Sequence, residues 1–205
     1  MRQIFISGTD TNVGKTLISA WIALHTGFSY FKPIQTGLKE GVDSYEVQRL
    51  SDVKIYPEIY AYKEPLSPHL AAKIENDTID IEKIILPQRN NLIIEGVGGV
   101  FVPINNTYLM IDLIKKLGAP VILVSRTRLG TINHTLLSLE ALRSRNIRVL
   151  GVIMNGEQNI QNCDAIEFYG RIPILAEFPE LEIVNNNTLK NVALPQNLKQ
   201  ILEVG

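Results

Sequence analysis

The segment that most constrains this chain is residues 8–16, GTDTNVGKT, because it joins an apolar run at residues 3–7 to an amphipathic run that begins at Lys15. A glycine-bearing loop between a strand and a helix presents backbone N–H groups that have no intrahelical partner and can bind an anion. Gly14 allows close approach of a phosphate, the Lys15 ammonium neutralises phosphoryl charge, and the Thr16 hydroxyl is a suitable Mg²⁺ ligand. The pattern therefore predicts a phosphate-binding loop.

The spacing of this loop departs from the standard pattern, in which four residues separate the two glycines. Here five residues separate Gly8 from Gly14, so Thr9 occupies the position of the usual first glycine. A polar turn between a strand and a helix is the alternative interpretation. The sequence Gly-Lys-Thr at a helix start, directly after an N-terminal apolar run, favours a variant P-loop.

Composition narrows the class of protein. The chain has 205 residues, of which 45% are hydrophobic and 20% charged, and this fits one domain with a full core. A net charge of -1 without a long basic stripe argues against a nucleic-acid partner, and no apolar run is long enough to span a membrane. No signal peptide is visible, so we expect a cytoplasmic protein. Cys163, the only cysteine, is interpreted as an ordinary free thiol.

Short apolar runs rich in β-branched residues alternate with helical patterns along the chain. We expect strands at residues 4–6, 30–31, 92–94, 121–124, 149–154 and 172–175, and helices at residues 15–25, 44–51, 108–116, 132–145, 164–169 and 198–202. The Asn-rich residues 185–187 are typical of a surface loop. Alternation of this kind predicts an α/β fold, a single-domain, mostly parallel sheet flanked by helices and similar to the P-loop NTPases.

In such a sheet, ligands bind beyond the carboxyl ends of the strands. Lys32 follows one predicted strand, and Pro33 with Thr36 and Gly37 favours a turn that aims its ammonium at the phosphate loop. An exposed charge is the commonest fate of a lysine. However, a second ammonium beside Lys15 suits a reaction in which negative charge moves from a γ-phosphate to an acceptor.

Two carboxylates are candidate metal ligands. Glu95 closes a wholly apolar predicted strand, where an unpaired carboxylate would be costly, and a metal ion would explain it. Asp43 has two interpretations of equal weight, as the cap of a helix that begins at Ser44 or as a metal ligand. The glycines at residues 96–99 permit close backbone approach, or form only a turn.

Five motifs together resemble those of the dethiobiotin synthetases, which use ATP and CO₂ to close a cyclic urea on 7,8-diaminononanoate. They are Gly-Thr-Asp-Thr-x-Val-Gly-Lys-Thr at residues 8–16, Lys-Pro-x-x-[Ser/Thr]-Gly at 32–37, Glu-Pro-x-Ser-Pro-His at 64–69, Glu-Gly-x-Gly-Gly at 95–99 and Leu-Gly-x-Ile-Asn-His at 129–134. They follow the order of the family and span most of the chain, which leaves little room for coincidence.

The resemblance implies a role for each matching residue. The ATP co-substrate would contact Asn12, Val13, Gly14, Lys15, Thr16, Leu17, Asp43, Glu95, Gly96, Val97, Gly98, Asn155, Pro179 and Leu181. Among these, Asn155 would read the adenine edge, and Pro179 and Leu181 would complete the base pocket. Mg²⁺ would be held by Thr16, Asp43 and Glu95. The catalytic residues would be Lys32 and Lys15.

The resemblance also implies a substrate site that is shared between two subunits. Diaminononanoate or its carbamate would contact Thr36, and its carboxylate would bind the helix start formed by Gly130, Thr131, Ile132 and Asn133. In the family, the other subunit of a homodimer contributes that helix start. An aromatic residue would line the substrate channel, with Phe168 and Tyr169 as candidates. Asn12 departs from the family, which commonly has Glu at this position.

The implied reaction needs no enzyme nucleophile, because CO₂ forms a carbamate on one amine, the γ-phosphoryl group is transferred to it, and the second amine closes the ring. Two other functions use related folds. A partition-type switch ATPase carries an additional lysine five positions before the P-loop lysine, where this chain has Asp10. A glutamine-dependent ligase acting on corrin rings needs a glutaminase domain with a reactive cysteine, for which 205 residues leave no space.

Overall fold

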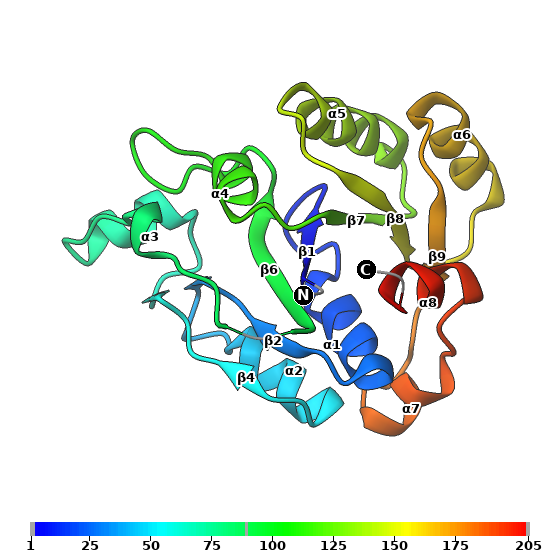
Figure 1. Ribbon diagram of the computed structural model, residues 1–205, viewed down its shortest axis with the longest axis horizontal. Coiled ribbons are helices and arrows are strands. Elements are labelled where there is room, and N and C mark those ends of the chain that lie inside the picture. Colours follow the sequence, from blue (N-terminus) through cyan, green and yellow to red (C-terminus); the bar gives the residue numbers. More distant parts are fainter. Residues whose placement is uncertain (1–2, 89, 204–205) are drawn as a thin grey trace.

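A computed structural model of the chain describes residues 3–88 and 90–203 (Figure 1). Within that part of the chain, seven strands form a parallel sheet in the order β4-β2-β6-β1-β7-β8-β9. They are β1 (Gln3–Gly8), β2 (Ser29–Phe31), β4 (Ile55–Tyr56), β6 (Leu92–Gly99), β7 (Val121–Arg126), β8 (Val149–Asn155) and β9 (Ile174–Phe178). A second parallel pair joins β3 (Ile34–Thr36) to β5 (Tyr60–Tyr62).

Helices cover both faces of the large sheet. They are α1 (Lys15–Thr26), α2 (Asp43–Ser51), α3 (Pro68–Ile74), α4 (Met110–Leu117), α5 (Thr131–Ser144), α6 (Ile160–Gly170), α7 (Asn186–Asn191) and α8 (Gln196–Glu203), with the 3₁₀ turn η1 (Ile81–Lys83). Figure 1 shows α1, α2, α7 and α8 on one side of the sheet and α3, α4, α5 and α6 on the other. No helix in the described ranges is long and apolar enough to cross a membrane.

The continuous apolar strands are buried on both faces because successive side chains point to opposite sides of a sheet. Ile4 and Ile6 of β1 pack in the cluster that contains Trp21 of α1, whereas Phe5 packs in the cluster that contains Ile111 of α4. All these side chains are at most 5% exposed. The predicted α/β fold with a helix-flanked parallel sheet is therefore confirmed.

Several boundaries and small elements differ from the prediction. The strand expected at residues 172–175 begins at Ile174, and the helix expected at 164–169 begins at Ile160. The predicted loop at residues 185–187 is wrong, because Asn186 opens α7. The side chain of Asn185 accepts a hydrogen bond from the N–H of Thr188 at 3.0 Å, so an Asn-rich segment here supplies a helix cap.

The carboxyl ends of β1, β2, β6, β7 and β8 lie at one edge of the sheet because all these strands are parallel. That edge carries the phosphate loop after β1, Lys32 after β2, and Asn155 at the end of β8. Glu95 does not close its strand, as the sequence predicted, but lies within β6. The strand continues through the glycines, and Gly99 pairs with Gly8 beyond an irregularity in the register.

Candidate active site

The loop between β1 and α1 has a backbone conformation that requires glycine at position 14. Gly14 caps α1 with a φ of 95°, a left-handed conformation that favours glycine. A Cβ atom at this position would lie 2.0 Å from Nδ2 of Asn155. That Nδ2 atom donates a hydrogen bond to the carbonyl oxygen of Val13 at 2.9 Å. The end of β8 therefore packs directly against the loop, and Gly14 is required there.

The Lys15 ammonium lies inside the loop. It donates a hydrogen bond to the carbonyl oxygen of Asp10 at 3.0 Å, and the residue is 6% exposed. Burial lowers the pKa of Lys15 to about 8; Glu95 opposes this shift, whereas Lys32 adds to it. A phosphate bound in the loop would give the buried ammonium a negatively charged partner.

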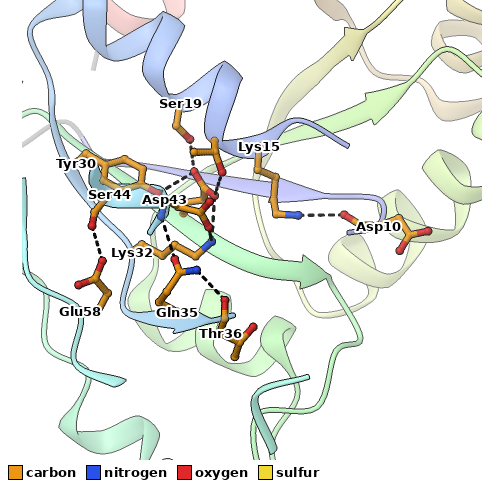
Figure 2. Close-up of polar contacts among 12 residues, drawn as sticks. Asp10, Lys15, Ser19, Tyr30, Lys32, Gln35, Thr36, Asp43, Ser44 and Glu58 are labelled. Atoms are coloured by element: carbon orange, nitrogen blue, oxygen red, sulfur yellow. Dashed lines mark hydrogen bonds and ion pairs between the residues drawn. The ribbon is translucent and has the colours of Figure 1, made fainter. Parts of the chain in front are cut away.

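The Glu95 carboxylate, 1% exposed, accepts hydrogen bonds at both oxygens, and its partners Ser19, Tyr30 and Lys32 are labelled in Figure 2. Its Oε1 atom accepts from Oγ1 of Thr16 at 2.9 Å and from Nζ of Lys32 at 3.3 Å. Its Oε2 atom accepts from Oγ of Ser19 at 2.8 Å and from the hydroxyl of Tyr30 at 2.9 Å. Glu95 therefore links the phosphate loop, helix α1 and strand β2.

Lys32 lies between two carboxylates, in close contact with Asp43 and within ion-pair distance of Glu95. Burial by itself would lower the pKa of Lys32, but the Glu95 and Asp43 carboxylates raise it, so the ammonium stays charged. The interpretation of Asp43 as a helix cap is wrong. Helix α2 begins at Asp43, Val42 is the cap residue, and the Asp43 side chain pairs with Lys32.

The oxygen ligands in this cluster fit Mg²⁺ bound together with phosphate. Thr16 offers a hydroxyl, and Asp43 and Glu95 offer carboxylates that already hold one cation, the Lys32 ammonium. No group of three or more His, Cys, Asp or Glu side chains suited to a metal occurs in the described part of the chain. Mg²⁺ usually takes one or two carboxylates plus water and substrate phosphates, so a dedicated cage is not required.

Two adjoining clefts meet at the phosphate loop. The larger, about 1130 Å³, contains Lys15, Lys32 and Glu95 in its lining. The smaller cleft, about 610 Å³, is lined by residues that include Asn155 and Pro179. Both are lined by Asn12, Leu17 and Val184, so the clefts share part of their walls beside the loop. An extended ligand with a phosphate chain at the loop and a ring in the smaller cleft fits this arrangement.

Comparison with known proteins identifies the family. A family described as "AAA domain" matches residues 2–188. The ATP-dependent dethiobiotin synthetase of Lawsonia intracellularis is 58% identical over 202 residues, which cover 98% of this chain and 100% of that protein. The enzyme of the same name from Paramagnetospirillum magneticum is 47% identical over 197 residues, which cover 95% and 96%. This chain belongs to the dethiobiotin synthetase family.

Solved structures agree on the fold of this dethiobiotin synthetase family member. A ParA family ATPase from Chlorobium tepidum superposes with a TM-score of 0.60 over 98% of this chain and 96% of the other, at 16% identity. Identity at that level supports a shared fold only. At the position of the additional lysine expected for a partition-type ATPase, this chain has Asp10, whose carboxylate accepts a hydrogen bond from the N–H of Thr11 at 2.6 Å.

Most residues that the dethiobiotin synthetase motifs single out come together in the two clefts. The larger cleft is lined by Asn12, Gly14, Lys15, Thr16, Leu17, Lys32, Thr36, Asp43, Glu95, Val97 and Gly98. The smaller is lined by Asn12, Leu17, Asn155, Pro179 and Leu181. Val13 and Gly96 lie behind this surface, Val13 with a buried side chain and Gly96 against the ring of Phe5.

The helix start at residues 130–133 does not line either cleft. Gly130 caps α5 with a φ of 94°, but the N–H of Thr131 already donates to the carbonyl oxygen of Arg128 at 3.1 Å. The Thr131 side chain is buried against Oγ of Ser125 at 2.8 Å. Within the predicted carboxylate site, the N–H group and the side chain of Thr131 are therefore already engaged inside the chain. Phe168 and Tyr169, the candidate channel residues, are exposed on α6, also outside the clefts.

Sequence reasoning missed three residues at the site. Ser19 lies three residues after Thr16, so both reach the same side of α1, and this spacing could have indicated it. Tyr30 lies inside an apolar strand and gave no signal. Arg126, at the end of β7, donates from Nε to the carbonyl oxygen of Asn12 at 2.8 Å. Its position at a strand end could have indicated a role in the site.

Proposed function

We propose that this chain catalyses the ATP-dependent closure of 7,8-diaminononanoate with CO₂ to dethiobiotin, ADP and phosphate. The observation that carries the proposal is the convergence of the phosphate loop, Lys32 and the carboxylates of Asp43 and Glu95 on one cleft. The family of the chain supports the same reaction. The reaction consumes ATP, which supports a cytoplasmic location.

The chemistry proceeds in three balanced steps. One amine of the substrate adds to CO₂ and loses a proton, which gives a carbamate. A carbamate oxygen attacks the γ-phosphorus and ADP leaves, which gives a carbamic–phosphoric anhydride. The second amine attacks the anhydride carbonyl carbon, phosphate leaves and the amine loses a proton, which closes the cyclic urea.

The two buried lysines of the cleft supply preorganised positive charge for these steps. Lys15, at the phosphate loop, would hold the phosphates of ATP in position. Lys32, which donates to Oε1 of Glu95 at 3.3 Å, would stabilise negative charge on the carbamate and the transferred phosphoryl group. Thr36, which also lines the cleft, would contact the carbamate. Since positioning and charge stabilisation are sufficient, no covalent enzyme intermediate is needed.

We also propose that Thr16, Asp43 and Glu95 hold Mg²⁺ with the nucleotide. When bound, Mg²⁺ would neutralise phosphate charge in the transition state. Lys32 supports this assignment because its ammonium, 4% exposed, already lies between the two carboxylates. In the smaller cleft, Asn155, Pro179 and Leu181 would surround the adenine. The Oδ1 atom of Asn155 would accept from the base, since its Nδ2 atom donates to Val13.

We further propose that the chain is one domain and acts as a homodimer. Packing of helices on both faces of one sheet supports a single domain. Leu129, fully exposed, precedes the helix start of α5, and Leu137, 61% exposed, lies further along the helix; both support burial of this region against a second subunit. In that dimer, residues 130–133 of one subunit would bind the substrate carboxylate above the phosphate loop of the other.

The test is to incubate the purified chain with diaminononanoate, bicarbonate, Mg²⁺ and ATP and to measure dethiobiotin by mass spectrometry. We expect dethiobiotin and ADP in equal amounts from the wild type, and neither from Lys15→Ala. ATP hydrolysis that proceeds at the same rate without diaminononanoate, and with no dethiobiotin, would overturn the proposal in favour of a switch ATPase.

A further inference from the structure

The two oxygens of the Glu95 carboxylate have different kinds of partner. Oε1 contacts residues of the larger cleft, Thr16 at 2.9 Å and Lys32 at 3.3 Å. Oε2 contacts Ser19 at 2.8 Å and the Tyr30 hydroxyl at 2.9 Å, two residues that do not line that cleft. Ser19 reaches the carboxylate from α1 and Tyr30 reaches it from β2, and both side chains are labelled in Figure 2. One oxygen is therefore directed at the cleft and the other is anchored behind it.

The anchoring side is buried. Ser19 and Tyr30 are 0% exposed, and Glu95 is 1% exposed. Both hydroxyls donate to an oxygen that can only accept, so together they restrict rotation of the carboxylate group.

We propose that Tyr30 and Ser19 are positioning residues that hold Oε2 of Glu95 and so present Oε1 alone to a divalent cation in the cleft. This inference rests on the proposed function, in which Glu95 is a Mg²⁺ ligand. Outer residues that orient a metal-binding side chain commonly change metal affinity by about 10- to 100-fold when they are removed. A carboxylate without these two anchors can rotate or turn both oxygens towards Lys32, and either change weakens binding of the cation.

A purely structural role for the two hydroxyls predicts a different result. In that case they would only satisfy a buried carboxylate, and their loss would lower the free energy of unfolding without changing metal affinity. Metal affinity, measured apart from stability and turnover, therefore distinguishes the two roles.

The experiment compares Tyr30→Phe, Ser19→Ala and the double variant with the wild type. Binding of Mn²⁺ to the protein–ADP complex is followed from the EPR signal of free Mn²⁺, and ADP affinity is measured separately in EDTA. We expect each single variant to weaken Mn²⁺ binding about 10-fold or more. The effects should be non-additive in the double variant because both hydroxyls bind the same oxygen.

Turnover adds a second readout. The Mg²⁺ concentration for half-maximal dethiobiotin synthesis should rise in the variants, whereas the KM for diaminononanoate should not change. Tyr62→Phe is the matched control. Tyr62 is 3% exposed and donates from its hydroxyl to Asp77 at 2.8 Å, so it is also a buried tyrosine on a carboxylate, but it lies outside the cleft lining. Its metal affinity should equal that of the wild type.

Folded variants that bind Mn²⁺ as tightly as the wild type would overturn the inference, and a loss of the same size in Tyr62→Phe would do so too. If Tyr30→Phe does not fold, Ser19→Ala decides the question. Failure of the proposed function has a different signature, because the wild type itself would then make no dethiobiotin. If the wild type is active and the variants keep its metal affinity, only the positioning role is overturned.

Discussion

The side-chain amide of Asn155 donates a hydrogen bond to the carbonyl oxygen of Val13 across 2.9 Å, and so joins the end of β8 to the phosphate loop. Asn155 also lines the smaller cleft, where we place the adenine. On the adjacent strand β7, Arg126 pairs in register with Asn155, and its Nε atom donates to the carbonyl oxygen of Asn12 at 2.8 Å. The shape of the phosphate loop therefore depends on strands β7 and β8 as well as on its own sequence.

We predict that Asn155→Asp weakens ADP binding by roughly 10- to 100-fold, since an unsatisfied polar group costs about 1–3 kcal/mol. The substitution keeps the size of the side chain but replaces the donor that faces Val13 with an acceptor. Isothermal titration calorimetry measures the effect. Asn105→Asp is the control, because Nδ2 of Asn105 donates to the carbonyl oxygen of Ile79 at 2.7 Å, away from both clefts. Equal ADP affinity in wild type and Asn155→Asp would contradict the prediction.

The second prediction concerns the pKa of Lys15, which burial lowers from 10.5 to about 8 in the folded protein. Between these values the unfolded chain binds a proton at Lys15 that the folded chain lacks, so the free energy of unfolding contributed by this group rises with pH. The cost of burying the charge is full below pH 8 and is relieved as pH approaches 10.5. Bound phosphate favours the charged ammonium and raises its pKa again.

Nucleotide binding above pH 8 should therefore take up a proton at Lys15, and affinity should fall as pH rises further. Calorimetry of ADP binding in two buffers of different ionisation enthalpy gives the number of protons. We expect uptake that approaches one proton at about pH 9 and almost none at about pH 7, which serves as the internal control. Equal proton exchange at both pH values would show that Lys15 is not the titrating group.

Six strands of the main sheet, β1, β2, β6, β7, β8 and β9, could be predicted from the sequence because they form short apolar runs, most of them buried on both faces. Between β2 and β6 only α2 was predicted. The elements β3, β4, β5 and α3 of that segment have two to seven residues, so neither periodicity extends far enough to be recognised. The position of Glu95 inside β6 was also missed, because a run of glycines usually ends a strand, whereas here Gly99 still pairs with β1.

The site could be predicted where its residues follow strand ends, as Lys15, Lys32 and Asn155 do. The partners of those residues could not, because tertiary packing determines them. Nothing in the local sequence indicates that Tyr30 reaches Glu95, which is far away in the chain but on the adjacent strand β6. The two interpretations of Asp43 had equal support in the sequence. The structure removes the cap, because Val42 is the cap residue of α2, and the metal role stays a prediction.

The last prediction concerns the helix start at Gly130, which lies outside both clefts of its own chain. If this turn binds the substrate carboxylate above the phosphate loop of a second subunit, each active site needs residues of two chains. A subunit disabled by Lys32→Ala and one disabled by Gly130→Val should then complement each other. Gly130 has a φ of 94°, so a β-branched residue there distorts the first turn of α5.

Neither variant alone should make dethiobiotin, and both should bind ADP, which serves as the control for folding. In a mixed dimer, one site carries both lesions and the other carries neither. Random exchange of equal amounts makes half of the dimers mixed, with one intact site of two, so activity should return to about a quarter of wild type. If subunit exchange is demonstrated independently and no activity returns, the helix start of α5 acts within its own chain or is only a cap, and the shared active site is wrong.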